Sequence, residues 1–269
     1  MTSGSGVENR SSGELSPQSS RLQGKVAVVT GAGRNVGEAI AVQLAREGAR
    51  VAVVDVERQA ADRTAATVNA LRPESAVAIC CDVSLSGEVE TMVEEVWSRL
   101  GGVDILVNSV AITDRGRTVL DLSDKEWSRV LDITLGGTFY CCREVAKRMV
   151  DAGRVGSIVN IGSTSGYQPR ANALAYPTAK AALYGFSKSI ALQLGRHRIR
   201  VNCVTPNKVG SPVGEAEERD RPRDNLIGRA CRPQDIANAV AFVVSEEASF
   251  ITGTDLVVDG GALISASMD

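Results

Sequence analysis

The segment KVAVVTGAGRNVG, residues 25–37, carries in immediate succession the signals for a strand, a tight turn and a helix. Its apolar, β-branched run predicts a buried parallel strand over residues 25–30. The glycines between Gly31 and Gly37 permit a tight turn, and an amphipathic pattern from Glu38 to about Glu47 predicts a helix. Because the N–H groups and dipole of a helix N-terminus favour anions, this turn predicts a pyrophosphate-binding site. A strand–helix turn without a ligand is the alternative.

A second apolar run, residues 51–55, ends in an acid, Asp55, eighteen residues after Gly37. A carboxylate at this strand end accepts hydrogen bonds from a ribose diol and repels a 2′-phosphate, which favours NAD over NADP. Arg34 in the glycine turn is a cation that could instead contact a 2′-phosphate. We give Asp55 more weight, because Arg34 can pair with a nearby acid.

Further short apolar runs alternate with helical patterns along the rest of the chain. The alternation predicts one α/β domain: a Rossmann-like, doubly wound parallel sheet of about seven strands with helices on both faces. We expect the site at the carboxyl ends of the strands. Strands are predicted over residues 76–81, 103–107, 157–161, 198–204 and 255–259, and helices over 87–100, 125–150 (one long helix or two abutting ones), 176–195 and 233–245.

Three polar side chains follow the run at residues 157–161 in a pattern suited to proton transfer. Tyr176 and Lys180 are four residues apart, so on a helix they share one face. A tyrosine phenol titrates near ~10, and a neighbouring ammonium lowers that pKa. Tyr176 could then exchange a proton with a substrate oxygen that the Ser163 hydroxyl holds. A helix with an incidental tyrosine and lysine is the alternative.

These features resemble the short-chain dehydrogenase/reductase family over about residues 24–263. The matching features are Tyr176-x-x-x-Lys180, Ser163 thirteen residues before the tyrosine, the TGAGRNVG turn at residues 30–37 and the DGG at residues 259–261. The resemblance implies that Tyr176 is the general acid/base and that Ser163 orients the substrate carbonyl. It also implies that Lys180 lowers the pKa of Tyr176 and holds the nicotinamide ribose.

The resemblance further implies a cofactor site distributed along the chain. In that site Asp82 binds the adenine amino group with help from the Val83 backbone, and the Val209 backbone and Ser211 hold the nicotinamide carboxamide. The implied cofactor-binding residues are Gly31, Arg34, Asn35, Val36, Gly37, Asp55, Asp82, Val83, Asn108, Tyr176, Lys180, Pro206, Val209 and Ser211.

Four positions depart from the family pattern. Asn35 and Asn207 stand where glycine is usual, and we expect both to keep the backbone shape, because asparagine tolerates left-handed backbone better than other non-glycine residues. Ala111 also replaces a glycine, and its methyl group fits only if φ stays negative. Thr134 replaces an asparagine that bends the helix and holds a water behind the lysine. Thr134 can bond back to a helix carbonyl, and it is either part of the catalytic group or an ordinary helical threonine.

Composition restricts the classes of function. Hydrophobic residues make up 43% of the chain, and a net charge of −2 gives no electrostatic footprint for nucleic acid or an anionic membrane. No apolar run approaches the ~18 residues of a membrane span. The six cysteines lack zinc-ligand spacing, so we predict no metal site, reduced thiols and a cytoplasmic protein. The lone His197 is assigned no chemistry.

The chain divides into a tail and one domain. Residues 1–21 are rich in serine and glycine, lack a secretory signal, and are predicted to be a disordered tail before a dinucleotide-binding domain at residues 22–269. Residues 207–228 are polar with prolines and glycines, which predicts a substrate lid or an ordinary surface loop.

Together these observations predict an NAD(H)-dependent oxidoreductase that interconverts a secondary alcohol and a ketone on a small-molecule substrate. The four departures keep open a non-redox role on the same fold, as a lyase, an isomerase or a nucleotide-sensing binding module. The resemblance implies a homotetramer or homodimer built on the long helices around Thr138 and Leu183.

Overall fold

A parallel sheet forms the centre of the molecule, which a computed structural model describes over residues 21–209 and 225–265. Within these residues the sheet has seven strands in the order β3-β2-β1-β4-β5-β6-β7, and every neighbouring pair is parallel. The strands are β1 (Val26–Thr30), β2 (Arg50–Asp55), β3 (Ala76–Cys80), β4 (Ile105–Asn108), β5 (Gly156–Ile161), β6 (Ile199–Pro206) and β7 (Asp255–Val258).

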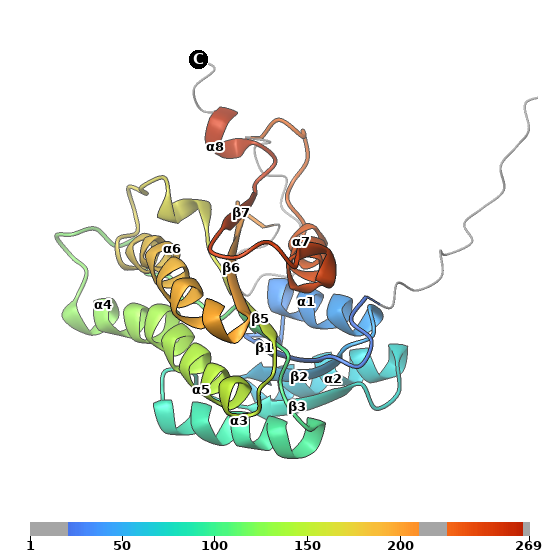
Figure 1. Cartoon of the computed structure of the whole chain (residues 1–269). Coiled ribbons are helices and arrows are strands. Elements are labelled where there is room, and N and C mark those ends of the chain that lie inside the picture. Colours follow the sequence, from blue (N-terminus) through green and yellow to red (C-terminus); the bar gives the residue numbers. More distant parts are fainter. Residues whose placement is uncertain (1–20, 210–224, 266–269) are drawn as a thin grey trace, which may run out of the picture.

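Helices connect the strands and cover both faces of the sheet (Figure 1). They are α1 (Asn35–Arg46), α2 (Arg58–Leu71), α3 (Ser86–Leu100), α4 (Asp124–Leu131), α5 (Gly137–Asp151), α6 (Ala175–Leu194), α7 (Pro233–Val244) and the short α8 (Ala262–Ser265). A π-helical turn (Asp132–Gly136) joins α4 to α5.

Successive β1 side chains belong to opposite core layers, as the period of two along a strand requires. Ala27 and Val29 belong to the layer that contains residues of α1, α2 and α7. Val26 and Val28 belong to the layer that contains residues of α3, α5 and α6. All four side chains are buried, which accounts for the uninterrupted apolar run in the sequence.

The strand order reverses direction between β1 and β4, and this position determines where a ligand can bind. Because all strands are parallel, their carboxyl ends lie at one edge of the sheet. In open α/β sheets ligands bind in the crevice outside those ends, at the point of reversal. The glycine turn after β1, Asp55 at the end of β2, Asn108 at the end of β4 and Ser163 beyond β5 all lie at this edge.

The predicted fold class is confirmed, with local differences. The sequence pattern identifies no helix between β2 and β3, where the structure has α2. The long helical pattern at residues 125–150 corresponds to α4 and α5 with the π-helical turn between them. Arg21, assigned to the tail, belongs to the described domain, because its Nε donates to Glu47 Oε2 at 2.7 Å. Residues 1–20 lie outside the described residues.

Candidate active site

Ser163 lies just beyond the carboxyl end of β5, and its backbone is held in place from behind. The Tyr184 hydroxyl donates to the Ser163 carbonyl oxygen at 2.6 Å, and the Ser163 N–H lies 3.4 Å from the same hydroxyl. The Ser163 Oγ accepts from the Ser165 N–H at 3.2 Å. These contacts fix the direction of the Ser163 side chain at the edge of the sheet.

Tyr176 and Lys180 lie one turn apart near the start of α6, and Tyr176 faces Ser163. The Tyr176 hydroxyl lies near enough to the Ser163 side chain for the two to interact, and this interaction favours the phenolate. Lys180 Nζ lies 5.8 Å from the centre of the Tyr176 ring and donates to the Ile161 carbonyl oxygen at 2.6 Å. The structure therefore brings together the three side chains that the sequence pattern singles out.

Burial dominates the protonation of both ionisable groups. Burial raises the pKa of Tyr176, and the Ser163 hydrogen bond and the Arg170 charge offset this only in part. Burial lowers the pKa of Lys180 to about 8. The net pKa of Tyr176 is therefore raised in this structure, because burial outweighs the groups that favour the phenolate, and the lowering role of Lys180 stays a prediction.

Aromatic and acidic side chains behind Ser163 hold Tyr184 in place. Its ring stacks on Tyr167 with ring centres 4.6 Å apart. The Tyr167 hydroxyl donates to Asp255, whose other carboxylate oxygen accepts from Thr205 Oγ1 at 2.7 Å. Asp255 on β7 is thereby linked, through side chains alone, to the backbone of Ser163.

The glycine turn after β1 closes tightly against the end of β2. Asp55 Oδ2 accepts from the Gly33 N–H at 2.9 Å. A Cβ at Gly37 would lie only 2.0 Å from the Gly31 carbonyl oxygen, so the turn requires glycine there. Asn35 has φ +54°, which confirms the prediction that asparagine supports left-handed backbone at this position.

The same region fits the phosphates and ribose of a dinucleotide. No side chain among the described residues caps α1. The N–H groups at the N-terminus of this helix, next to the glycine turn, therefore have no side-chain acceptor. The Asn35 Oδ1 is buried with no hydrogen-bond partner in the described chain, and so is the Asn108 Oδ1. Arg34 pairs with Glu57 at 3.2 Å, as the sequence argument anticipates.

The residues implied for the adenine and the centre of the cofactor lie along the same edge. Asp82 Oδ1 accepts from the Ser84 N–H and hydroxyl at 2.9 and 2.7 Å. Val83 is buried against α5 at Gly137. Asn108 Nδ2 donates to Asn160 Oδ1 at 2.9 Å within the core.

At the expected nicotinamide end, one prediction about the backbone holds and one does not. Ala111 keeps a negative φ, as its methyl group requires. Asn207 is not in the left-handed region, so the prediction for this position is wrong. Its Oδ1 instead accepts from Thr164 Oγ1 at 3.1 Å, beside Pro206 at the end of β6. Val209 forms a parallel bridge with Cys231. Ser211 and most of the expected lid, residues 210–224, lie outside the described residues.

Thr134 lies in the π-helical turn that packs against α6. It is fully buried, and its Oγ1 has no hydrogen-bond partner among the described residues. The bond to a helix carbonyl that this hydroxyl could form is therefore not made. The Thr134 carbonyl oxygen does accept such a bond, from Thr138 Oγ1 at 2.8 Å.

Asp114, a buried acid in the loop after β4, carries no signal in the sequence pattern that marks it as part of the site. Its carboxylate accepts the backbone N–H groups of Leu174, Ala175 and Tyr176 at 2.7, 2.7 and 3.0 Å. These groups lie sixty or more residues further along the chain, so the local spacing rules for helix caps do not identify the contact. Tyr184 is missed for the same reason.

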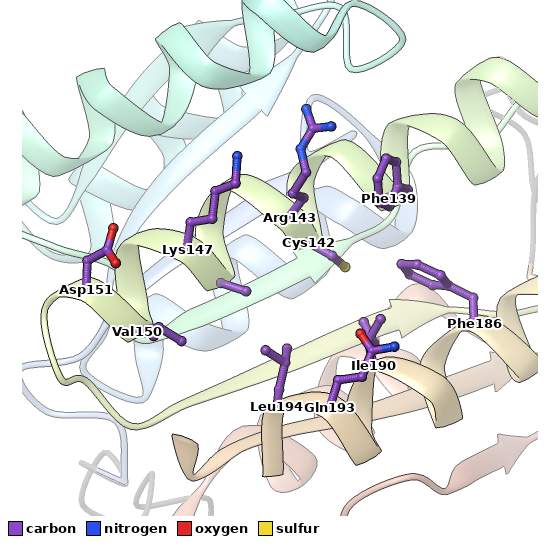
Figure 2. Close-up of a pocket in the computed structure, with 11 residues that line it drawn as sticks. Phe139, Cys142, Arg143, Lys147, Val150, Asp151, Phe186, Ile190, Gln193 and Leu194 are labelled. Atoms are coloured by element: carbon purple, nitrogen blue, oxygen red, sulfur yellow. The ribbon is translucent and has the colours of Figure 1, made fainter. Parts of the chain in front are cut away.

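A groove of about 350 Å³ between α5 and α6 is separate from this site (Figure 2). Its α6 residues begin at Phe186, ten residues or about 15 Å beyond Tyr176. Thr138 and Leu183 are themselves buried within the subunit, at 5% and 1% exposure, but the groove lies on the two long helices that carry them, so a subunit contact on these helices stays a prediction. The lining residues are Phe139, Cys142, Arg143, Ala146, Lys147, Val150, Asp151, Phe186, Ile190, Gln193 and Leu194.

Residues 21–209 and 225–265 contain neither a membrane-spanning helix nor a cluster of metal ligands. No helix in these ranges is long and apolar enough to cross a membrane. No cluster of three or more histidine, cysteine, aspartate or glutamate side chains in them could hold a metal ion.

Comparison with known proteins identifies similar chains along nearly the whole length. The family model described as enoyl-(acyl carrier protein) reductase matches residues 31–262. A short-chain dehydrogenase/reductase from Aspergillus oryzae is 34% identical over 248 residues, covering 89% of this chain and 95% of the relative. A D-threitol dehydrogenase from Mycolicibacterium smegmatis is 38% identical over 250 residues, covering 91% and 95%. The solved structure of a 3-ketoacyl-(acyl-carrier-protein) reductase from Brucella melitensis complexed with NADH has a TM-score of 0.83 at 33% identity, covering 90% of this chain and all of that chain.

Proposed function

The chain belongs to the short-chain dehydrogenase/reductase family, and from this premise we propose that it is an NAD(H)-dependent oxidoreductase. Its substrate is a small molecule with a secondary alcohol or the corresponding ketone. The observation that carries the proposal is that Tyr176 lies beside Ser163 and next to a buried Lys180, at the edge of the sheet that also holds the glycine turn.

Each of the three side chains has a distinct role in this reaction. A bound nicotinamide dinucleotide supplies or accepts the hydride. The raised pKa of Tyr176 keeps its phenol protonated at neutral pH, which is the form that donates a proton to a carbonyl oxygen. Ser163 holds that oxygen by hydrogen bond. Lys180, which is buried and charged below pH about 8, supplies a cation beside the phenol.

Asp55 supports a preference for NAD(H) over NADP(H). Its carboxylate closes the end of β2 against the glycine turn, where a 2′-phosphate would meet a negative charge. Arg34, the cation that could have attracted this phosphate, is paired with Glu57. A similar protein has been solved with NADH, which fits this assignment.

The test follows reduced-nicotinamide absorbance with a panel of ketones and secondary alcohols, with NAD(H) and NADP(H) compared in parallel. We expect turnover with NAD(H), and a loss of ~100-fold or more in kcat for Tyr176→Phe, because general acid–base catalysis contributes ~100- to 10,000-fold. NADH affinity, measured by calorimetry, should change little, since Phe keeps the ring. Equal turnover by both proteins would refute the catalytic role.

A binding role without redox turnover is the second candidate. The buried Thr134 hydroxyl without a hydrogen-bond partner in the described chain favours it, because this threonine replaces an asparagine that would connect the lysine to solvent. Tight NADH binding by calorimetry, with no turnover across the panel, would support this candidate over the oxidoreductase.

A further inference from the structure

We infer that Asp114 is a positioning residue for Tyr176: its carboxylate caps α6 from the loop after β4 and fixes the first turn of the helix that carries the proposed acid. The inference rests on the proposed function for the role of Tyr176, but the cap itself can be measured without any reaction.

The contact uses both carboxylate oxygens of a buried side chain. Asp114 is 6% exposed. Its Oδ2 accepts from the N–H groups of Leu174 and Ala175, each at 2.7 Å. Its Oδ1 accepts from the N–H of Tyr176 at 3.0 Å. Three consecutive amides, including that of Tyr176 itself, are therefore held by one side chain.

The helix has no cap of its own. Leu174 occupies the N-cap position, and its side chain cannot accept a hydrogen bond. The first N–H groups of a helix have no partner within the helix, and burying them without an acceptor costs free energy. Asp114 supplies that acceptor from sixty residues earlier in the chain, and its negative charge suits the positive end of the helix dipole.

The surroundings of Asp114 favour the ionised form of its carboxylate. Burial is the largest single influence and raises the pKa of Asp114, but the hydrogen bonds from backbone N–H groups, foremost those of Leu174, Tyr176 and Ala175, together outweigh it and lower the pKa below its usual value. An ionised acid has acceptor capacity on both oxygens, which is what the three amides need.

A second contact fastens the same two segments together. The Gly116 N–H donates to the Asn172 carbonyl oxygen at 2.8 Å, just before α6 begins. The loop itself is closed by the Arg117 N–H, which donates to the Asp114 carbonyl oxygen at 3.1 Å. Asp114 is therefore on a loop that is docked against the chain leading into α6.

The position of Tyr176 makes it sensitive to this cap. It is the second residue of α6, whereas Lys180 lies a full turn further in and is held separately by the Ile161 carbonyl oxygen. Loss of the cap should loosen the first turn and displace the Tyr176 hydroxyl from Ser163. A misplacement of ~1 Å in a catalytic group can cost ~100-fold in rate. The effect should appear in kcat and leave cofactor binding nearly unchanged.

The experiment compares Asp114→Ala, Asp114→Asn and the control Ser123→Ala in the full chain. Ser123 caps α4 by accepting from the Glu126 N–H at 3.3 Å, so its loss removes a cap on a helix that carries none of the three proposed catalytic side chains. Amide hydrogen exchange over residues 172–178 and calorimetric NADH affinity are measured for each variant. Kinetics follow, well below the unfolding midpoint, with the substrate found for the wild type.

We expect Asp114→Ala to speed exchange at residues 174–176 by ~10-fold or more and to lower kcat by ~10- to 100-fold. Its NADH affinity should stay within about threefold. Asp114→Asn should lie between the wild type and Asp114→Ala in both measurements, because its single amide oxygen can accept from Leu174 and Ala175 whereas its NH2 group cannot accept from the Tyr176 N–H. Ser123→Ala should leave exchange at residues 174–176 and kcat unchanged.

Two results would overturn the inference. Unchanged exchange in Asp114→Ala would show that the carboxylate does not hold the first turn. Faster exchange with unaltered kcat would show that the cap does not position the acid. Failure of the proposed function is a different result: Tyr176→Phe would then match the wild type, whereas the exchange measurement would still report on the cap.

Discussion

Tyr176 and Lys180 have opposite responses to burial, and both responses favour the neutral form of the side chain. A buried phenol keeps its proton to higher pH, whereas a buried ammonium loses its proton at lower pH. Near neutral pH the pair therefore consists of a protonated phenol and an ammonium close to its own pKa. In this state Tyr176 can donate a proton to a carbonyl oxygen. Lys180 begins to lose its positive charge just above neutral pH.

The lowered pKa of Lys180 makes the stability of the protein depend on pH, and the variant Lys180→Met tests this dependence. Below pH about 8 the lysine is charged in both the folded and unfolded states, and the folded protein bears the full cost of burying it. Between about 8 and ~10.5 the folded state has lost this proton and the unfolded chain still holds it, so wild-type stability rises with pH. Lys180→Met lacks this rise. The difference between the two proteins should change by up to ~3 kcal/mol across that interval.

Urea unfolding without added nucleotide, at several pH values from ~7 to ~10, measures this difference. The exposed Lys188 provides a matched control, because Lys188→Met should follow the wild-type curve in parallel. If the free energy of unfolding changed with pH in the same way for wild type and Lys180→Met, the lowered pKa of Lys180 would be contradicted.

At the scale of secondary structure, the π-helical turn between α4 and α5 places an unsatisfied hydroxyl against α6. Thr134 Oγ1 has no partner among the described residues, although the carbonyl oxygen of the same residue accepts from Thr138. A buried polar group without a partner costs ~1–3 kcal/mol. Such turns occur frequently at functional sites. The two threonines therefore contribute to stability with opposite sign.

Thr134→Val tests this directly, because valine has nearly the same shape and lacks the hydroxyl. We expect the free energy of unfolding to increase by ~1 kcal/mol, since an unpaired polar group is removed from the core. Thr138→Val should instead decrease it by ~1 kcal/mol, because the hydrogen bond to the Thr134 carbonyl is lost. Denaturant unfolding of the two variants gives both values. A loss of stability in Thr134→Val as large as that in Thr138→Val would be the opposite result.

The elements differ in how far the sequence predicts them. β1, the glycine turn and α1 follow from local patterns, and so does the pairing of Tyr176 with Lys180 on one face of α6. The contacts that place these elements against each other do not follow, because they join distant parts of the chain. Asp114 caps a helix sixty residues away, and no local spacing rule covers such a pair. The pKa of Tyr176 also depends on burial, which the i, i+4 spacing does not contain.

Over the whole molecule, the parallel sheet gathers side chains from distant segments at one edge, and the apolar groove lies elsewhere. The fold class and the edge that carries the site follow from alternating strands and helices. The groove between α5 and α6 does not, because it depends on which side chains of the two helices remain outside the core (Figure 2). Its walls combine apolar residues such as Phe139 and Ile190 with Arg143, Lys147 and Asp151. Apolar centres with polar rims are typical of subunit interfaces.

We therefore expect this face, which lies on the long helices that carry Thr138 and Leu183, to join two copies of the chain in the predicted homodimer or homotetramer. A two-fold contact places the same patch on both subunits, so a charge introduced at Phe139, which is 42% exposed, would face the partner's apolar surface. Phe139→Glu should shift the mass measured by analytical ultracentrifugation to a smaller species, with unchanged circular dichroism. Leu120→Glu, at a 93% exposed position outside the groove, should keep the wild-type mass. A Phe139→Glu protein with the mass of an oligomeric wild type would place the contact on another face, and a monomeric wild type would refute the assembly itself.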